Sequence, residues 1–403
     1  MDAIINLILL LLVLTILVLL HELGHFIAAR RAGVTVHEFG IGFPPRAKVL
    51  FRRGATIYTL NWLPIGGFVR MEGEERSPAD GTPDEEEDEP FLEPERADEV
   101  ESLDPHAFVN QSLARRLTIL FAGAGVNFLI AWLVFTSVAF AAEPTWKVRL
   151  GYVQPDSPAA SVGLVGGEYV ETVEYEVTQD GVPTGEMRSV DLYDDTGDLI
   201  IAIDGRTFPV FDDLARTDAA STGRILPIQY LADRAGEEVI LTVERPDGTV
   251  EEVAVTLRPP LEAAEQGALG FRPGRADFGQ QQNGLVDSMI TGLEMTAETS
   301  TLILRAVGNI VVGLFSGTGE GLDEVAGPVG MISVIGTVRT DLPPIFLIWF
   351  IGLISANLAV INLLPIPPLD GSRMVMAVVQ RVSGDRVSPA TERLVYFSGW
   401  VAL

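Results

Sequence analysis

Three long apolar stretches stand out in the pattern of hydrophobic and polar positions. They cover residues 3–20, 117–142 and 345–364. Each approaches or exceeds the roughly 20 apolar residues that a helix needs to cross a bilayer. The pattern therefore predicts membrane-spanning helices within 1–31, 112–142 and 345–371.

The last apolar stretch, residues 394–403, is too short to cross a bilayer alone. We expect a partial fourth span over 390–403. The chain then reads as a polytopic α-helical membrane protein with about four spans.

The segments between the spans carry other periodicities. Residues 147–260 contain short strand-like runs separated by Gly, Pro and Asp, which predicts a compact, mostly β domain. Within 32–71, two apolar runs flank Gly54 and predict a β-hairpin, either on the surface or dipping into the membrane. Residues 284–317 repeat apolar side chains at helical spacing, which predicts an amphipathic helix or an ordinary core-packing one.

Charge is distributed unevenly. The net charge is −27, and residues 72–104 hold sixteen acidic side chains against two arginines, a net of −14. Such a segment cannot bury a core and is predicted to be a disordered acidic loop. Acidity on this scale excludes nucleic acid as a partner, because phosphate binding needs clustered Lys and Arg.

Basic residues predict the orientation. They follow the first span and precede the second, so the positive-inside rule places the loop between these spans in the cytoplasm. The region after residue 142 is then extracytoplasmic. The arginines and lysine concerned are Arg30, Arg31, Arg46, Lys48, Arg52, Arg53, Arg70, Arg115 and Arg116.

The first span ends in an HExxH motif formed by His21, Glu22 and His25. A spacing of four places both imidazoles on one helix face, where they can bind one Zn²⁺ while the glutamate acts on a bound water. Ionisable groups in a span cost about 2.5 to 3.5 kcal/mol each on insertion scales, so three in five residues indicate a function. The chain has no cysteine, which leaves His and carboxylates as the zinc ligands.

A catalytic zinc needs a third protein ligand. His37 and His106 are better read as solvated or capping side chains. Asp370 is the stronger candidate, because it closes the third span after a run of prolines that interrupts the helix. Without the HExxH motif, Asp370-Gly371 would read as a simple helix stop.

These motifs together resemble the site-2 protease family of intramembrane zinc metalloproteases, and within it the bacterial regulator-of-sigma-E protease (RseP-like) group. The resemblance rests on HExxH, on the 362–371 segment NLLPIPPLDG, on the 327–330 segment GPVG, and on a PDZ-like pattern in 154–164 and 197–205. It departs from the family in an insert over 165–196 and in the absence of Pro before Asn127.

The resemblance implies roles for individual residues. His21, His25 and Asp370 match the zinc ligands, and Glu22 matches the catalytic glutamate. Asn362 matches a position near the substrate, and we expect it to contact the substrate strand. We also expect Pro365 and Pro367 to contact the substrate strand.

The expected function is hydrolysis of peptide bonds within transmembrane segments of single-span membrane proteins, such as pre-cleaved anti-sigma factors or remnant signal peptides. The hairpin of 32–71 is expected to be membrane-associated. The inserted PDZ-like α+β domain of 147–260 is expected to bind a peptide C-terminus. The expected location is the bacterial inner membrane, with the site toward the cytoplasm. A non-catalytic PDZ scaffold with a vestigial zinc site is the alternative, and an intact Glu22 disfavours it.

Overall fold

The computed structural model describes residues 2–74, 104–179, 182–210, 225–316 and 328–383. They divide into two compact units, one of residues 1–136 with 292–403 and one of residues 137–291. Most of the predicted acidic loop of 72–104, and the predicted partial span of 390–403, lie outside the described residues.

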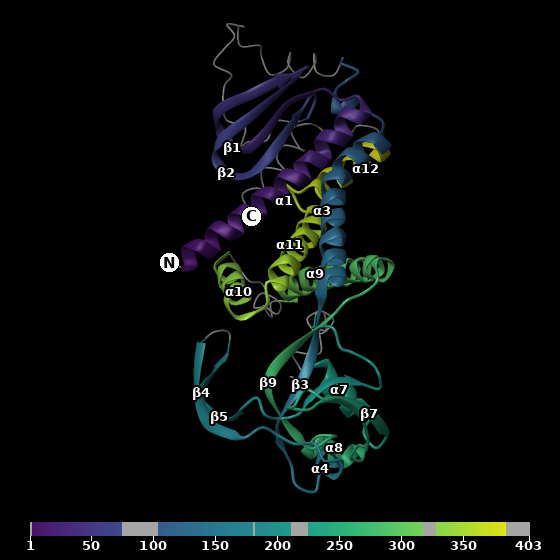
Figure 1. The fold of residues 1–403 in the computed structure, drawn as a ribbon. Helices are drawn as coiled ribbons and strands as arrows, with labels where there is room; N and C mark the ends of the chain where they lie inside the picture. Colours follow the sequence, from purple (N-terminus) through teal and green to yellow (C-terminus); the bar gives the residue numbers. More distant parts are fainter. Residues whose placement is uncertain (1, 75–103, 180–181, 211–224, 317–327, 384–403) are drawn as a thin grey trace. The chain divides into compact units, whose positions relative to one another are not determined.

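Within the described residues, three helices are long and apolar enough to cross a membrane. They are α1 (Asp2–Ala32), α3 (Leu113–Ala142) and α11 (Ile345–Asn362). The chain is accordingly a polytopic membrane protein that also carries β-structure (Figure 1). The third helix is shorter than the predicted span of 345–371, because Pro365 and Pro367 cannot continue it. A separate helix, α12 (Asp370–Ser383), begins at Asp370.

Packing in the first unit surrounds α1. The helix α10 (Pro328–Asp341) and α11 lie against its first half, where a buried apolar cluster joins the three helices. Its buried members are Leu10, Leu17, Ile335, Phe350 and Ile354. Arg339 of α10 donates to Asn6 Oδ1 at 2.9 Å and to Asp2 Oδ1 at 2.9 Å. These contacts fix α10 at the start of α1.

The strands β1 (Val36–Arg53) and β2 (Thr56–Met71) form a bent antiparallel sheet beside α1 (Figure 1). The first half of β1 pairs with both halves of β2: Phe39, for example, lies opposite Tyr58 and also opposite Val69. The predicted hairpin around Gly54 is therefore the outer part of a larger sheet. Many of its apolar side chains are exposed, and Trp62 has the largest exposed fraction, 71%.

The second unit is built on one antiparallel five-stranded sheet. Its strand order is β8-β7-β6-β3-β9, with β3 (Glu143–Val153), β6 (Leu199–Ile203), β7 (Glu238–Glu244), β8 (Val250–Thr256) and β9 (Phe271–Gln281). The helices α4 (Pro158–Ser161), α7 (Leu226–Asp233) and α8 (Pro260–Gln266) complete it. Leu150, Ile203 and Leu241 are among its buried core residues.

The predicted domain limits of 147–260 are too narrow. The edge strand β9 begins at Phe271 and pairs with β3 from Glu143 onward. Its sequence, FRPGRADFGQQ, has no apolar alternation, because an edge strand needs no continuous buried face.

The insert of 165–196 contains a two-stranded antiparallel hairpin. Its strands are β4 (Tyr169–Gln179) and β5 (Val182–Tyr193). After β9 the chain enters α9 (Leu285–Ser316), which occupies the region of the predicted amphipathic helix.

Candidate metal centre

Three potential metal-binding atoms meet at the C-terminal part of α1. Asp370 Oδ2 lies 3.0 Å from His21 Nε2 and 3.1 Å from His25 Nε2, and the two Nε2 atoms are 3.1 Å apart. The side chains are nearly inaccessible, with exposed fractions of 7% for each histidine and 13% for Asp370. The structure thus brings the HExxH histidines and the late aspartate into one cluster.

His25 is oriented by a backbone contact from another helix. Its Nδ1 lies 2.8 Å from the carbonyl oxygen of Ile119 on α3. A carbonyl can only accept, so Nδ1 carries the proton and Nε2 presents its lone pair to the cluster. Such a contact through the second ring nitrogen is typical of metal-binding histidines.

His21 has a corresponding contact with Asn127. The side-chain amide of Asn127 lies 3.3 Å from His21 Nδ1, and Asn127 is completely buried. The amide oxygen has no hydrogen-bond partner among the described residues. The amide atom at this distance is Nδ2. If Nε2 binds a metal, Nδ1 holds the proton, and a 180° rotation of the amide would present its unpaired Oδ1 as the acceptor.

Asn127 is in turn held by α11. Ser355 Oγ donates to the Asn127 carbonyl at 2.8 Å, and Ser355 is completely buried. This contact links α3 to the last span next to the cluster.

Glycines allow the helices to approach at this point. A Cβ atom at Gly123 of α3 would lie 2.4 Å from His25 Nε2 and 2.6 Å from His21 Nε2. A Cβ atom at Gly24 of α1 would lie 2.5 Å from the Ala122 carbonyl oxygen. Small residues permit such close crossings of membrane helices. The space beside the two imidazoles therefore exists only because residue 123 has no side chain.

The loop between α11 and α12 positions Asp370. Leu369 N donates to the Ile366 carbonyl at 2.9 Å, and Ser372 Oγ donates to the Leu369 carbonyl at 2.7 Å. A Cβ atom at Gly371 would lie 2.2 Å from the Leu363 carbonyl oxygen, so the loop can fold back only over a glycine. A carboxylate in the first turn of α12 is also favoured by the helix dipole.

Glu22 follows His21 on α1 and is half-buried. The sheet reaches its stem, since a Cβ at Gly67 of β2 would lie 3.7 Å from Glu22 Cγ and 3.3 Å from a Leu19 methyl carbon. At the end of β2, Glu74 forms an ion pair with Arg373 of α12. The sheet is thereby connected to the helix that carries Asp370.

The other candidate residues lie outside the cluster. Asn362 is the last residue of α11, and Pro365 and Pro367 belong to the loop before Asp370. His37 pairs with Glu72, and His106 Nδ1 lies 2.9 Å from the Gly33 carbonyl oxygen just past the end of α1.

The donor set fits a zinc ion. A tetrahedral Zn²⁺ with ligands at about 2.0 to 2.1 Å separates neighbouring ligand atoms by about 3.3 Å. The three separations here are 3.0, 3.1 and 3.1 Å. Two imidazoles and one carboxylate fill three positions and leave the fourth for water or substrate, as catalytic zinc requires.

The positioning residues were less visible in the sequence than the donors. Gly123 and the Ile119 carbonyl act through a helix crossing that local spacing does not reveal. The two close glycines of α3, Gly123 and Gly125, are the available signal, because paired small residues in a span often mark a helix contact.

Comparison with known proteins agrees with this geometry. The sequence profile described as peptidase family M50 matches residues 9–403. The zinc metalloprotease RasP of Geobacillus kaustophilus is 27% identical over 443 residues, covering 96% of this chain and 92% of that protein. RasP of Oceanobacillus iheyensis is 26% identical, with coverages of 96% and 93%. The regulator of sigma-E protease RseP of Escherichia coli is 24% identical, with coverages of 96% and 93%.

The family match extends over nearly the whole chain, from within α1 to the last residue. It includes both parts of the His21, His25 and Asp370 cluster. The chain therefore belongs to peptidase family M50, the site-2 protease family.

Proposed function

We propose that this chain cleaves peptide bonds within transmembrane segments of single-span membrane proteins, using His21, His25 and Asp370 as zinc ligands and Glu22 as general base. Its membership of the family makes it an intramembrane zinc metalloprotease. One observation carries the assignment of the site: both histidine Nε2 atoms lie within 3.1 Å of Asp370 Oδ2.

When bound at these three residues, Zn²⁺ supplies Lewis-acid polarisation of the scissile carbonyl and lowers the pKa of water to about 7. Glu22 removes the proton from the attacking water and later donates it to the leaving amine. The Ile119 carbonyl and the Asn127 amide keep the imidazoles oriented through both events. The buried helix crossing at Gly24 and Gly123 excludes bulk water from this side of the centre.

Access of a peptide bond requires local unwinding, because a helical substrate shields its own amides. We propose that the unwound segment pairs with the sheet of β1 and β2, which replaces the lost backbone hydrogen bonds. The approach of Gly67 to the Glu22 stem supports this route. Asn362, Pro365 and Pro367 contact the opposite side of the substrate in this proposal, since they lie in the segment that leads to Asp370.

The exposed apolar side chains of the sheet support its association with the membrane. Phe43, Phe51, Trp62, Leu63 and Ile65 have exposed fractions of 43%, 53%, 71%, 53% and 41%. A soluble protein rarely exposes so many large apolar groups in one element.

For the second unit we propose a PDZ-like domain that binds a peptide C-terminus. The support is its five-stranded antiparallel sheet with short helices and the pattern in 154–164 and 197–205. It would select substrates that an earlier cut has shortened, such as trimmed anti-sigma factors or remnant signal peptides. A competitor peptide with a free carboxylate should then slow cleavage of a trimmed substrate more than its amidated form does.

The proposed location is the bacterial inner membrane, with the metal centre toward the cytoplasm and the PDZ-like unit outside. The arginines that flank the first two spans support this orientation. The net charge of −27 disfavours nucleic acid as a partner.

The test is cleavage of a single-span reporter by the purified chain in detergent. We expect Glu22→Gln to abolish cleavage and zinc chelation to remove it reversibly, whereas Glu298→Gln on α9 should leave it unchanged. Cleavage by Glu22→Gln at the wild-type rate would refute the proposal. Binding of the reporter without cleavage by the wild-type chain would favour the non-catalytic scaffold.

A further inference from the structure

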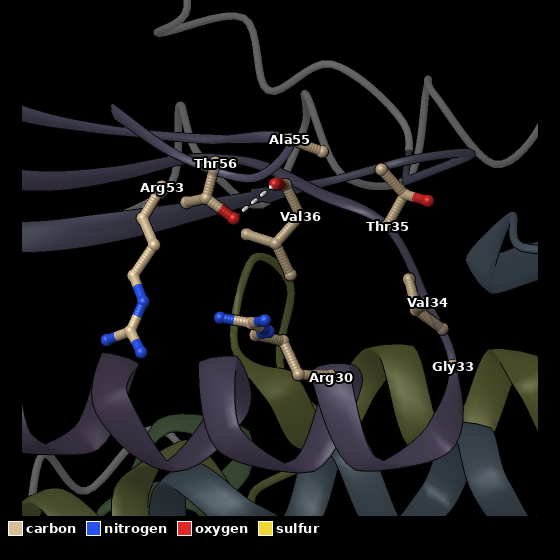
Figure 2. Close-up of a pocket in the computed structure, with 8 residues that line it drawn as sticks. All are labelled: Arg30, Gly33, Val34, Thr35, Val36, Arg53, Ala55 and Thr56. Carbon is tan, nitrogen blue, oxygen red and sulfur yellow. Dashed lines mark hydrogen bonds between the residues drawn. The ribbon is translucent and has the colours of Figure 1, made fainter. Parts of the chain in front are cut away.

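A cavity of about 230 Å³ lies between the C-terminal end of α1 and the turn that joins β1 to β2. Figure 2 shows Arg30 extending from α1 and Arg53 from the sheet into the space between these elements. Gly33 and Val36 form part of the wall where the chain leaves the helix for β1. The cavity is separate from the metal centre, because Arg30 follows His21 by nine residues, about 13 Å along a helix.

Two arginines give the cavity positive charge. Among the described residues, neither Arg30 nor Arg53 forms an ion pair. Arg30 stacks over the Phe26 ring at 5.6 Å, an arrangement that leaves the guanidinium N–H groups available. No carboxylate of the described part of the chain lines the cavity.

Several other polar groups at this end of α1 already have partners. Thr56 Oγ1 donates to the Val36 carbonyl at 2.8 Å. The last helical carbonyls accept from the following turn, with Val34 N to Ala29 O at 3.0 Å and Gly33 N to Arg30 O at 3.3 Å. The two guanidinium groups are the charged recognition elements of the cavity, and they suit an anion with several oxygens.

An exposed apolar stripe on α1 leads to this cavity. Leu12, Ile16, Leu23 and Ile27 have exposed fractions of 54%, 48%, 37% and 40%. At 3.6 residues per turn, all four side chains point within about 60° of the direction of Arg30. The same helix face thus presents hydrocarbon along the span and a cation at its end.

We propose that this cavity binds the phosphate of an anionic phospholipid, with the acyl chains along the stripe and the phosphate between Arg30 and Arg53. A hydrocarbon stripe that ends in two cations matches the order of chemical groups in a lipid. A soluble phosphate would use the cations but not the stripe. The cavity is several times larger than the roughly 30 Å³ that a water occupies in the liquid, so it can accept a phosphate with part of its glycerol.

The site ties the sheet to the membrane surface. Arg53 belongs to the outer turn of the sheet that reaches Glu22 through Gly67, whereas Arg30 belongs to the helix of the zinc ligands. A phosphate bridging both cations stabilises the position of the sheet against α1.

The test is lipid binding by the full-length chain, purified in detergent and freed of lipid, with native mass spectrometry as the readout. The probes are phosphatidylglycerol, phosphatidylcholine and diacylglycerol with the same acyl chains, together with glycerol 3-phosphate and inorganic phosphate. The variant is Arg30→Gln/Arg53→Gln. The matched control is Lys48→Gln/Arg52→Gln, which removes equal charge from exposed positions of β1 that do not line the cavity.

We expect the wild-type and control chains to bind phosphatidylglycerol in preference to the other probes. At about 1 kcal/mol for each basic residue near a membrane surface, the Arg30/Arg53 variant should bind it about 30-fold more weakly. The folding of all three chains is checked by their bound zinc, which neither double variant should change.

Three results would overturn the proposal. Equal loss of binding in both double variants would indicate a nonspecific charge effect. Binding of glycerol 3-phosphate or inorganic phosphate as tightly as phosphatidylglycerol would assign the cavity to a soluble anion. Binding of phosphatidylglycerol only after deletion of residues 78–101 would assign the cavity to the acidic segment of the chain itself.

Discussion

Asp370 Oδ2 lies 3.0 Å from His21 Nε2, although 349 residues separate the two in the sequence. The first spanning helix α1 and the short helix α12, which follows α11, therefore supply one centre between them. Ser355 on α11 and Asn127 on α3 form a second link close to it, with Ser355 Oγ 2.8 Å from the Asn127 carbonyl oxygen. The centre therefore depends on the packing of four helices, α1, α3, α11 and α12.

Asn127→Ala should weaken zinc binding without removing a zinc ligand. The change removes the amide that faces His21 Nδ1. Loss of such a contact to a metal-binding histidine typically lowers metal affinity 10- to 100-fold. Competition with a chromophoric chelator measures the affinity. Asn6→Ala, a change to another buried asparagine of the same unit, is the control and should bind zinc as the wild type does.

Gly123→Ala should lower zinc content and abolish cleavage. The added methyl carbon would lie 2.4 Å from His25 Nε2, so the imidazole must move away from the cluster. Gly125→Ala adds the same methyl to the same helix, but its nearest neighbour is a Phe121 ring carbon at 3.2 Å. Metal analysis of both purified variants distinguishes them, and equal zinc content would show that Gly123 has no such role.

Glu143 should make the stability of the second unit depend on pH. Burial raises the pKa of Glu143 above its ordinary value, and the hydrogen bond from Asn283 Nδ2 at 2.8 Å opposes this shift. A raised pKa means that the folded state binds the proton more tightly than the unfolded state. Stability is then greatest below the ordinary carboxyl pKa and decreases as pH rises through the folded pKa.

Hydrogen exchange of peptides from β3 and β9, corrected for intrinsic rates, measures this dependence in the full chain. The side chain in Glu143→Gln cannot ionise. At pH 8, β3 and β9 should therefore exchange more slowly in this variant than in the wild type, whereas at pH 4 the two chains should exchange at nearly the same rate. An advantage of the same size at both values would mean that ionisation of Glu143 is not the cause.

The exposed face of the sheet should lie in the membrane. The chain has no cysteine, so Trp62→Cys introduces a unique site for a nitroxide label. Oxygen concentrates in the hydrocarbon of a bilayer, and polar nickel chelates are excluded from it. In proteoliposomes, oxygen should therefore relax the spin of the label at residue 62 more strongly than a nickel chelate does. A label at Asp247→Cys in the second unit is the aqueous control, and equal nickel accessibility at both sites would contradict membrane association.

The sequence predicts the parts of this structure that depend on local spacing. Apolar length predicts the three spanning helices, and the HExxH spacing places His21 and His25 on one face. The association of Asp370 with them could be inferred from chemistry, because a catalytic zinc needs a third ligand and the chain contains no cysteine.

The parts that depend on distant contacts could not be predicted in this way. The double pairing of β1 arises because its first half lies between two halves of β2, a register that no turn signal specifies. The sequence does not predict the strand β9, because Pro273 and Gly274 interrupt any alternation of apolar and polar residues. The role of Gly123 becomes apparent only when α3 crosses α1.

Zinc content of Asp370→Asn tests the central claim most directly, because it asks whether the distant aspartate and the HExxH histidines hold one metal. Full-length wild type, Asp370→Asn and Glu22→Gln would be purified in parallel, and bound zinc and reporter cleavage measured on the same samples. We predict one zinc per chain with cleavage in the wild type, one zinc without cleavage in Glu22→Gln, and loss of both zinc and cleavage in Asp370→Asn. Full zinc content with undiminished cleavage in Asp370→Asn would contradict the account.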